Sequence, residues 1–411
     1  KYNLKIEAND GQSFNNKGER SFSINVHSTP KSIIRVIPSK DIGNITSPQF
    51  KISGTSKGNK IKIYTDNKCL TIKGEKASTG SDLIITTKTP MEKDGEYQFF
   101  VKAEDEFGNE SLCSAFFASY TLDTSPPNAP SSLALKSPLK AIGNISNPTI
   151  TINGVISGDL VNIFAEKECK NSIGSGTATE NNIDIKVNKL IDGNYTFYAH
   201  STDPAGNTSP CSNASVSYLL DTVPPSSPKL LAFKKPDKSP GNNSTPEVIV
   251  NEIQSKELIQ VFTDNKCLNL KGSATSDGKS VSVKLQTLVE GNYTFFAMAT
   301  DQAGNDSTCS SDGLGYLLDL TPPKVPSKLT LKSPLKSPSN NPLPTVVVNG
   351  VAPEEIIEVF SDNSCKNLKG TGKANGSSIE VTTKSLPEGN YTFFAKSTDP
   401  AGNRSSCSTA S

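Results

Sequence analysis

A fifteen-residue segment recurs at a fixed interval and sets the organisation of the whole chain. It reads GNYTFYAHSTDPAGN at 193–207, GNYTFFAMATDQAGN at 291–305 and GNYTFFAKSTDPAGN at 389–403, with a looser copy, GEYQFFVKAEDEFGN, at 95–109. The tyrosines of the four copies lie 98 residues apart. A long period in unbroken register is typical of tandem domains, so the 411-residue chain is predicted to contain about four units of ordinary domain size.

Each unit is built from short runs in which polar and apolar residues alternate. Thr149–Ile152 and Leu160–Phe164 are examples from one unit, and the same runs return in the next two units. About seven such runs per unit, turn residues every 8–12 positions and no helical periodicity predict an all-β antiparallel β-sandwich.

Proline-rich junctions separate the units at 123–130, 221–228 and 319–326. Paired prolines favour extended backbone, so we expect stiff spacers and an extended rod. The predicted domains are 1–29 (the last two strands of a preceding domain), 30–123, 124–221, 222–319 and 320–411. The last unit is expected to lack its final strand, because the period places the next junction near position 417.

Two motifs resemble a known family. The TDPAGN loop at 202–207 and 398–403 and the LDTxPP junction at 220–225 are similar to those of bacterial immunoglobulin-like repeats of large cell-surface proteins and adhesins. The resemblance covers nearly the whole chain and implies Ig-like sandwiches that serve as spacers and display scaffolds. The chain departs from antibody domains because it has no tryptophan and its cysteines occupy different strands.

The eight cysteines occur as two per unit, 42 or 44 residues apart. This repeated spacing predicts one disulfide per domain and an oxidising, extracytoplasmic setting, stabilising each domain by about 4 kcal/mol in the chain-entropy treatment. The predicted pairs are Cys69–Cys113, Cys169–Cys211, Cys267–Cys309 and Cys365–Cys407. A metal site is the alternative, but the chain contains no CxxC motif and only two histidines, His27 and His200.

The charge balance and hydropathy exclude some partners. Lys and Arg number 42 against 41 Asp and Glu, so nothing favours a nucleic acid or an anionic membrane. No apolar run of about 20 residues is present to span a bilayer.

Acidic and amide side chains are expected to gather at each junction, because the loop after the sixth strand lies at the end where its domain begins. Clustered carboxylate and amide oxygens are ligands that Ca²⁺ takes, and related surface adhesins hold their junctions rigid with calcium. The candidate ligands are Asp123, Asp203, Asn207, Asp221, Asp301, Asn305, Asp319, Asp399 and Asn403. The alternative is a structural loop closed by an Asx hydrogen bond and a glycine with positive φ.

The remaining candidates favour structural roles. Tyr97, Tyr195, Tyr293 and Tyr391 are each predicted to form a tyrosine corner by bonding backbone just upstream, with an aromatic ligand platform as the alternative. His200 matches Lys102, Met298 and Lys396 in the other units, so it is expected to face solvent. No nucleophile–histidine–acid constellation can be assembled within a repeat.

These observations predict a non-enzymatic, extracellular stalk of Ig-like domains on a bacterial cell surface. No certain cofactor is expected beyond calcium, and the partner would be a cell-surface receptor, a glycan or another copy of the chain. The alternative is a filament subunit, in which incomplete terminal domains exchange strands.

Overall fold

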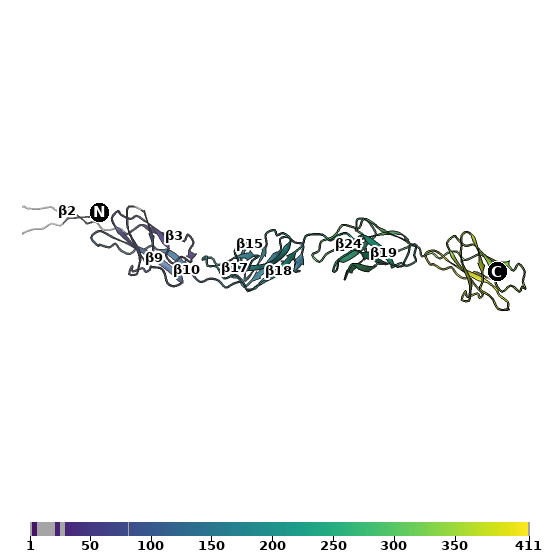
Figure 1. Ribbon diagram of the computed structural model, residues 1–411. Coiled ribbons are helices and arrows are strands. Elements are labelled where there is room, and N and C mark those ends of the chain that lie inside the picture. Colours follow the sequence, from purple (N-terminus) through teal and green to yellow (C-terminus); the bar gives the residue numbers. More distant parts are fainter. Residues whose placement is uncertain (1, 6–20, 25–28, 81, 410–411) are drawn as a thin grey trace, which may run out of the picture. The chain divides into compact units, whose positions relative to one another are not determined.

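The computed structural model describes residues 2–5, 21–24, 29–80 and 82–409. Within these ranges the regular elements are all β-strands, shown as arrows in Figure 1. The described part of the chain contains no helix with the length and apolarity that a membrane span requires. The all-β prediction is therefore confirmed.

Repeat 1 folds into two antiparallel sheets. The smaller has the order β3 (Ser32–Ile37), β5 (Gln49–Ser53), β8 (Asp82–Thr86). The larger has the order β4 (Ile42–Gly43), β10 (Ala118–Leu122), β9 (Gly95–Glu104), β6 (Lys60–Tyr64), β7 (Ile72–Ala77), in which only the β4–β10 pair is parallel. Before this repeat, β1 (Tyr2–Lys5) pairs with β2 (Ser21–Ile24).

Repeat 2 has the same plan. Its smaller sheet has the order β11 (Ser132–Ser137), β13 (Thr149–Asn153), β16 (Asn182–Lys186). Its larger sheet contains β18 (Val216–Leu220), β17 (Gly193–Thr202), β14 (Leu160–Phe164) and β15 (Ser172–Thr177). The short strand β12 covers Ile142–Gly143.

Repeats 3 and 4 continue the pattern. In repeat 3 the sheets are β19 (Leu230–Lys235), β20 (Glu247–Asn251), β23 (Ser280–Lys284), and β22 (Leu270–Thr275), β21 (Leu258–Phe262), β24 (Gly291–Thr300), β25 (Leu314–Leu318). In repeat 4 they are β26 (Lys328–Ser333), β27 (Thr345–Asn349), β30 (Ser378–Thr382), and β29 (Leu368–Lys373), β28 (Ile356–Phe360), β31 (Phe394–Thr398).

The alternation read in the sequence is what builds each core. In β13, Ile150 and Ile152 are fully buried whereas Thr149 and Thr151 are half-buried, because successive side chains of a strand point to opposite faces. Facing residues of the larger sheet, such as Val161, Ile163 and Phe197, belong to the same buried cluster. The β-sandwich therefore follows from a two-residue period repeated in both sheets.

The ten-residue strand β17 carries the GNYTF segment and pairs differently along its two halves. Gly193–Phe197 pairs with β18, and Tyr198–Thr202 pairs with β14. The counterparts β9 and β24 are also ten residues long and divide their partners in the same way. The recurring segment is thus the strand that joins two parts of one sheet.

In repeat 4 this strand is shorter. β31 covers only Phe394–Thr398, which is the half that pairs with β28. Residues 389–393 have no ladder partner among the described residues and are not a strand.

The last strand of repeats 1, 2 and 3 contributes a buried tyrosine that the sequence analysis did not single out. Tyr120, Tyr218 and Tyr316 are at most 2% exposed. The Tyr218 hydroxyl accepts a hydrogen bond from the Ile145 N–H (3.1 Å) and donates to the Ile145 carbonyl (3.0 Å). This burial raises the pKa of Tyr218. The tyrosine fastens the loop after β12 to the core.

We expect Tyr218→Phe to lower the opening free energy of repeat 2 by about 1–3 kcal/mol, because both backbone groups of Ile145 lose their partner in a part-buried position. Tyr195→Phe is the matched control: its hydroxyl donates to the exposed Ile191 carbonyl, which water can bond instead, and about 1 kcal/mol or less is expected. Hydrogen exchange of repeat 2 peptides measures both losses. Equal losses would contradict the assignment.

Candidate functional site

The DxAGN loop that follows the long strand is closed by its own aspartate. Asp203 Oδ1 accepts hydrogen bonds from the backbone N–H groups of Gly206 (2.8 Å) and Asn207 (2.9 Å), and Gly206 takes a φ of +97°. Asp301 and Asp399 make the same two bonds in repeats 3 and 4. The loop therefore has the Asx-turn geometry that the sequence analysis gave as its structural alternative.

The asparagine of the loop connects it to the junction. Asn207 Nδ2 donates to the main-chain carbonyl of Asp123 (2.8 Å) and to Asp203 Oδ2 (3.0 Å). Asn305 bonds Asp221 O and Asp301 Oδ2 in this way, and Asn403 bonds Asp319 O and Asp399 Oδ2. The predicted neighbours do meet, but through the carbonyl of the junction aspartate and not through its carboxylate.

An acidic side chain of the preceding repeat also binds the junction, and it was not predicted from the sequence. Asp94 Oδ1 accepts bonds from the N–H (2.9 Å) and hydroxyl (2.8 Å) of Thr124, and its Oδ2 accepts one from the Ser125 hydroxyl (2.8 Å). These bonds, led by the one from Ser125, lower the pKa of Asp94. In repeat 3, Glu290 accepts bonds from Leu320 N and the Thr321 hydroxyl. The available signal was an acid directly before the GNY or GEY glycine, at 94, 192, 290 and 388.

These junction residues do not fit a calcium ion well. Asp203 uses both carboxylate oxygens within its loop, and Asp123 Oδ1 accepts a bond from Ser125 N. The amide of Asn207 presents its N–H₂ toward the junction, whereas calcium requires oxygen ligands. Among the described residues there is no group of three or more His, Cys, Asp or Glu side chains placed to hold a metal. Calcium at the junctions stays a prediction without geometric support.

The tyrosines of the GNYTF segment bond backbone just upstream. The hydroxyls of Tyr97, Tyr195, Tyr293 and Tyr391 each donate to the carbonyl four residues earlier, at 2.6–3.0 Å. In repeats 2, 3 and 4 the tyrosine ring also stacks on the phenylalanine two positions later. This is the bond expected of a tyrosine corner.

The structure joins the four cysteine pairs that the spacing predicts. Cys69–Cys113, Cys169–Cys211, Cys267–Cys309 and Cys365–Cys407 have Cα–Cα distances of 5.8–6.0 Å. The described chain has no free cysteine. In repeat 2 the second cysteine, Cys211, lies in the connection before the last strand and precedes β18 by five residues.

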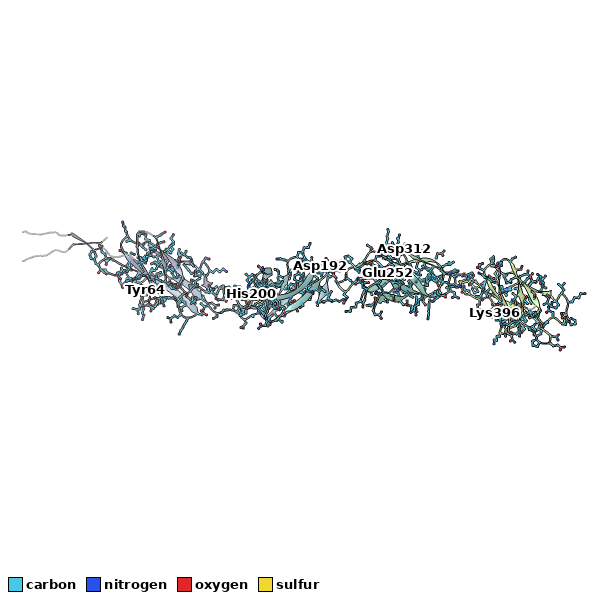
Figure 2. The ribbon with its side chains drawn as sticks, viewed as in Figure 1. Tyr64, Asp192, His200, Glu252, Asp312 and Lys396 are labelled. Atoms are coloured by element: carbon cyan, nitrogen blue, oxygen red, sulfur yellow. A yellow bond between two sulfur atoms is a disulfide. The ribbon has the colours of Figure 1, made fainter. Side chains whose placement is uncertain are left out.

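His200 was expected to face solvent; it alternates with the buried Ala199 and Ser201 and so lies on the outer face of its sheet, but it is only partly exposed. It is half-buried, and its ring centroid lies 4.8 Å from that of Phe164 on the neighbouring strand. Figure 2 labels His200 among the side chains of repeat 2. Burial lowers its pKa. Lys102, Met298 and Lys396 are half-buried at the same position. An aromatic residue of the neighbouring strand contacts this position in repeats 1 and 2, as Tyr64 beside Lys102 and Phe164 beside His200. His27 lies outside the described residues.

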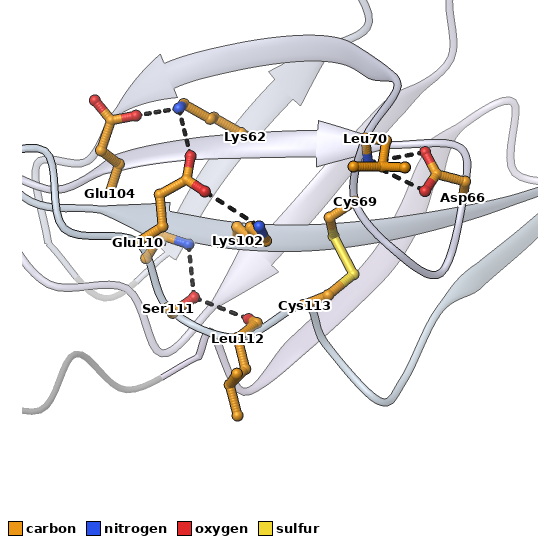
Figure 3. Close-up of polar contacts among 11 residues, drawn as sticks. Lys62, Asp66, Cys69, Leu70, Lys102, Glu104, Glu110, Ser111, Leu112 and Cys113 are labelled. Atoms are coloured by element: carbon orange, nitrogen blue, oxygen red, sulfur yellow. Dashed lines mark hydrogen bonds and ion pairs between the residues drawn. A yellow bond between two sulfur atoms is a disulfide. The ribbon is translucent and has the colours of Figure 1, made fainter.

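The acids near this position in repeat 1 are paired with lysines and not free for catalysis. Lys62 forms ion pairs with Glu104 and Glu110, and Lys102 pairs with Glu110 at 3.1 Å (Figure 3). The hydrogen bonds that Lys62 donates to Glu104 and then to Glu110 raise the pKa of Lys62, while the bonds that Glu110 accepts from Lys62 and Lys102 lower the pKa of Glu110. The network lies on the outer surface of the sheet formed by β6 and β9.

The comparisons with known proteins agree with the recognised motifs. Residues 137–222, nearly all of repeat 2, match the family model of the bacterial Ig-like domain. The resemblance to bacterial Ig-like repeats is confirmed for that segment. No curated protein matches the sequence.

Several solved structures are similar to the chain at low identity. The FN1–FN3 domains of chicken CNTN1 share 16% identity at a TM-score of 0.33, covering 71% of this chain and 98% of that one. The fibronectin(III)-like modules of Clostridium thermocellum CbhA share 15% sequence identity at a TM-score of 0.30, covering 46% of this chain and 94% of that one. The BSP domain of a biofilm associated protein shares 12% sequence identity at a TM-score of 0.17, covering 98% of both chains. At these values the similarities carry no functional argument.

We expect Asn207→Ala to lower the opening free energy of the junction around Asp123 by about 1–2 kcal/mol, because it removes the donor to a part-buried carbonyl. Hydrogen exchange of peptides spanning 118–126 reports this. The matched control is Asn109→Ala, whose amide bonds Asp105 within the equivalent loop of repeat 1 and should leave these peptides unchanged. Unchanged exchange in Asn207→Ala would contradict the role of the asparagine.

Repeat 2 is expected to lose stability in acid through His200. Its folded pKa is lowered below the unfolded value of 6.5, so the unfolded state binds more protons and stability falls as pH decreases through 6.5 toward the folded pKa. Thermal unfolding at about pH 7.5 and about pH 5 measures the loss. His200→Met, which carries the repeat 3 residue, should show a smaller difference; an equal one would exclude His200 as the cause.

Proposed function

We propose that this chain is part of a non-enzymatic protein outside a bacterial cell, in which tandem Ig-like domains form a stalk that displays or itself provides an adhesive surface. The observation that carries the proposal is the junction. Asn207, Asn305 and Asn403 make the same two hydrogen bonds at three successive junctions. A residue set repeated at every joint is expected of a modular array and not of a single active site.

The disulfides support a location outside the cytoplasm. Each of the four repeats contains one disulfide. Such bonds persist in oxidising compartments and are reduced in most cytosols. The match of residues 137–222 to a bacterial Ig-like domain supports a bacterial source.

The side chains that could perform chemistry have structural partners. His200 packs on Phe164, the loop aspartates bond their own backbone, and Glu104 and Glu110 are paired with lysines. These arrangements favour a binding or mechanical role. The partner would be a cell-surface receptor, a glycan or a second copy of the protein.

A filament subunit is the second candidate. The sheets of each repeat have edge strands, such as β7 and β15, and an edge strand can accept a strand from another molecule by β-augmentation.

Labelling of intact source cells with an antibody against this chain tests the location; labelling only after permeabilisation would overturn the proposal. Electron microscopy of the full-length protein then separates the candidates. Isolated particles are expected for the stalk. Long polymers with a fixed axial repeat would instead establish the filament.

A further inference from the structure

Three of the four repeats enclose a carboxylate next to the first cysteine of the disulfide. In repeat 1, Asp66 Oδ1 accepts bonds from the N–H groups of Lys68 (3.0 Å) and Leu70 (3.1 Å), and Oδ2 accepts bonds from Leu70 (3.1 Å) and Thr71 (2.7 Å). Figure 3 shows Asp66 and Leu70 beside the Cys69–Cys113 bond. The amides therefore bind the carboxylate from both sides of Cys69.

Repeats 3 and 4 build the same arrangement. Asp264 accepts bonds from the N–H groups of Lys266, Leu268 and Asn269, and Asp362 accepts them from Ser364, Lys366 and Asn367. Bonds to this carboxylate, led by the Ser364 hydroxyl, lower the pKa of Asp362 to about 2. These aspartates are thus ionised throughout the neutral range.

The bonds act on a cysteine in an unfavourable backbone conformation. The first cysteine has a φ of 49–54° in every repeat, within the left-handed region that residues with a Cβ avoid. In repeats 1, 3 and 4 the carboxylate bonds the residues on both sides of this cysteine. These hydrogen bonds to the carboxylate can persist after the disulfide opens. They then keep the thiol of the first cysteine directed at the thiol of the second.

Repeat 2 lacks most of these bonds. Glu166 replaces the aspartate, and its Oε1 accepts bonds only from the N–H (2.7 Å) and side-chain amide (3.1 Å) of Asn171. Among the described residues, the N–H groups of Glu168 and Lys170 make no bond to this carboxylate. Cys169 nevertheless has the same left-handed conformation, with a φ of 50°.

Repeat 3 provides the natural comparison for repeat 2. Cys69 and Cys365 are buried, at 4% and 7% exposure, whereas Cys169 and Cys267 are both half-buried. Both of these bonds close the same 42-residue separation. Repeats 2 and 3 therefore match in cysteine burial and loop length but differ in the acid.

We propose that Asp66, Asp264 and Asp362 are positioning residues that hold their disulfides closed, and that Cys169–Cys211, where Glu166 stands instead, is the disulfide that a dithiol opens first. A reduced loop without the carboxylate bonds relaxes, so its two thiols meet less often and closure is less favourable. Repeat 2 is thereby the redox-sensitive domain of the array.

The reaction is ordinary thiol–disulfide exchange. A thiolate of the dithiol attacks one sulfur of Cys169–Cys211 and gives a mixed disulfide. The second thiol of the reagent then attacks the reagent sulfur of this mixed disulfide and releases the protein cysteine. Two electrons and two protons thus pass to the two cysteines, and the reagent leaves as its cyclic disulfide.

The test equilibrates the 411-residue chain with reduced and oxidised dithiothreitol at graded ratios. Acid quenching, alkylation and peptide mass spectrometry give the reduced fraction at each cysteine. We expect Cys169–Cys211 to open at a reduced-to-oxidised ratio roughly tenfold lower than Cys267–Cys309. A shared midpoint, or earlier opening of another disulfide, would overturn the proposal.

Two reciprocal variants assign the effect to the acid. Glu166→Asp should raise the midpoint ratio of repeat 2 toward that of repeat 3, and Asp264→Glu should lower that of repeat 3 toward repeat 2. The control is Glu168→Asp, in the same loop, which should change nothing. Because the two midpoint ratios shift in opposite directions in different domains, a general loss of folding cannot produce both shifts. If either midpoint ratio stays unchanged in its variant, the positioning role is refuted.

Discussion

The divided pairing of the long strand is the constraint on which each repeat depends. Gly193–Phe197 bonds one neighbour and Tyr198–Thr202 bonds another, so a single strand holds the last strand and β14 in one sheet. Its inward residues Phe197 and Ala199 are fully buried, and its end leads directly into the DPAGN loop. Core, sheet order and junction are therefore all set by one segment, which explains why it recurs so closely.

The junctions between repeats are also held by hydrogen bonds from residues next to the long strand. A loop that is already closed by Asp203 presents the Asn207 amide, and this amide binds the carbonyl at the start of the junction. On the other side, Asp94 holds Thr124 and Ser125. The start of the proline-rich segment, at Asp123, Thr124 and Ser125, is thus bonded by side chains of both the preceding and the following repeat. The fixed φ of the prolines and the hydrogen bonds from these side chains both restrict the backbone of the junction.

Some of this was within reach of the sequence and some was not. The disulfide pairs, the upstream bonds of Tyr97 and its counterparts and the β-sandwich rest on spacing and periodicity, which a repeated sequence displays four times over. The buried Tyr218 was missed because its partner, Ile145, is 73 residues away. His200 was assigned to solvent because variation at a position was taken as exposure, whereas the covering group is Phe164 on another strand. Asp94 was missed because its role requires the junction to fold back onto it.

The sequence by itself determined the number of repeats, the strand pattern and which cysteines pair, because a two-residue period and a 98-residue interval act locally and repeat. Only the tertiary structure decided what the polar side chains do. Asp203 and Asn207 looked like calcium ligands as residue types, but their lone pairs and N–H groups are already directed at particular backbone atoms. Glu166 stands at the position of Asp264, and with its one additional methylene its carboxylate bonds a different set of amides. Direction and reach of a hydrogen-bonding group depend on the folded backbone around it, and no residue type specifies them alone.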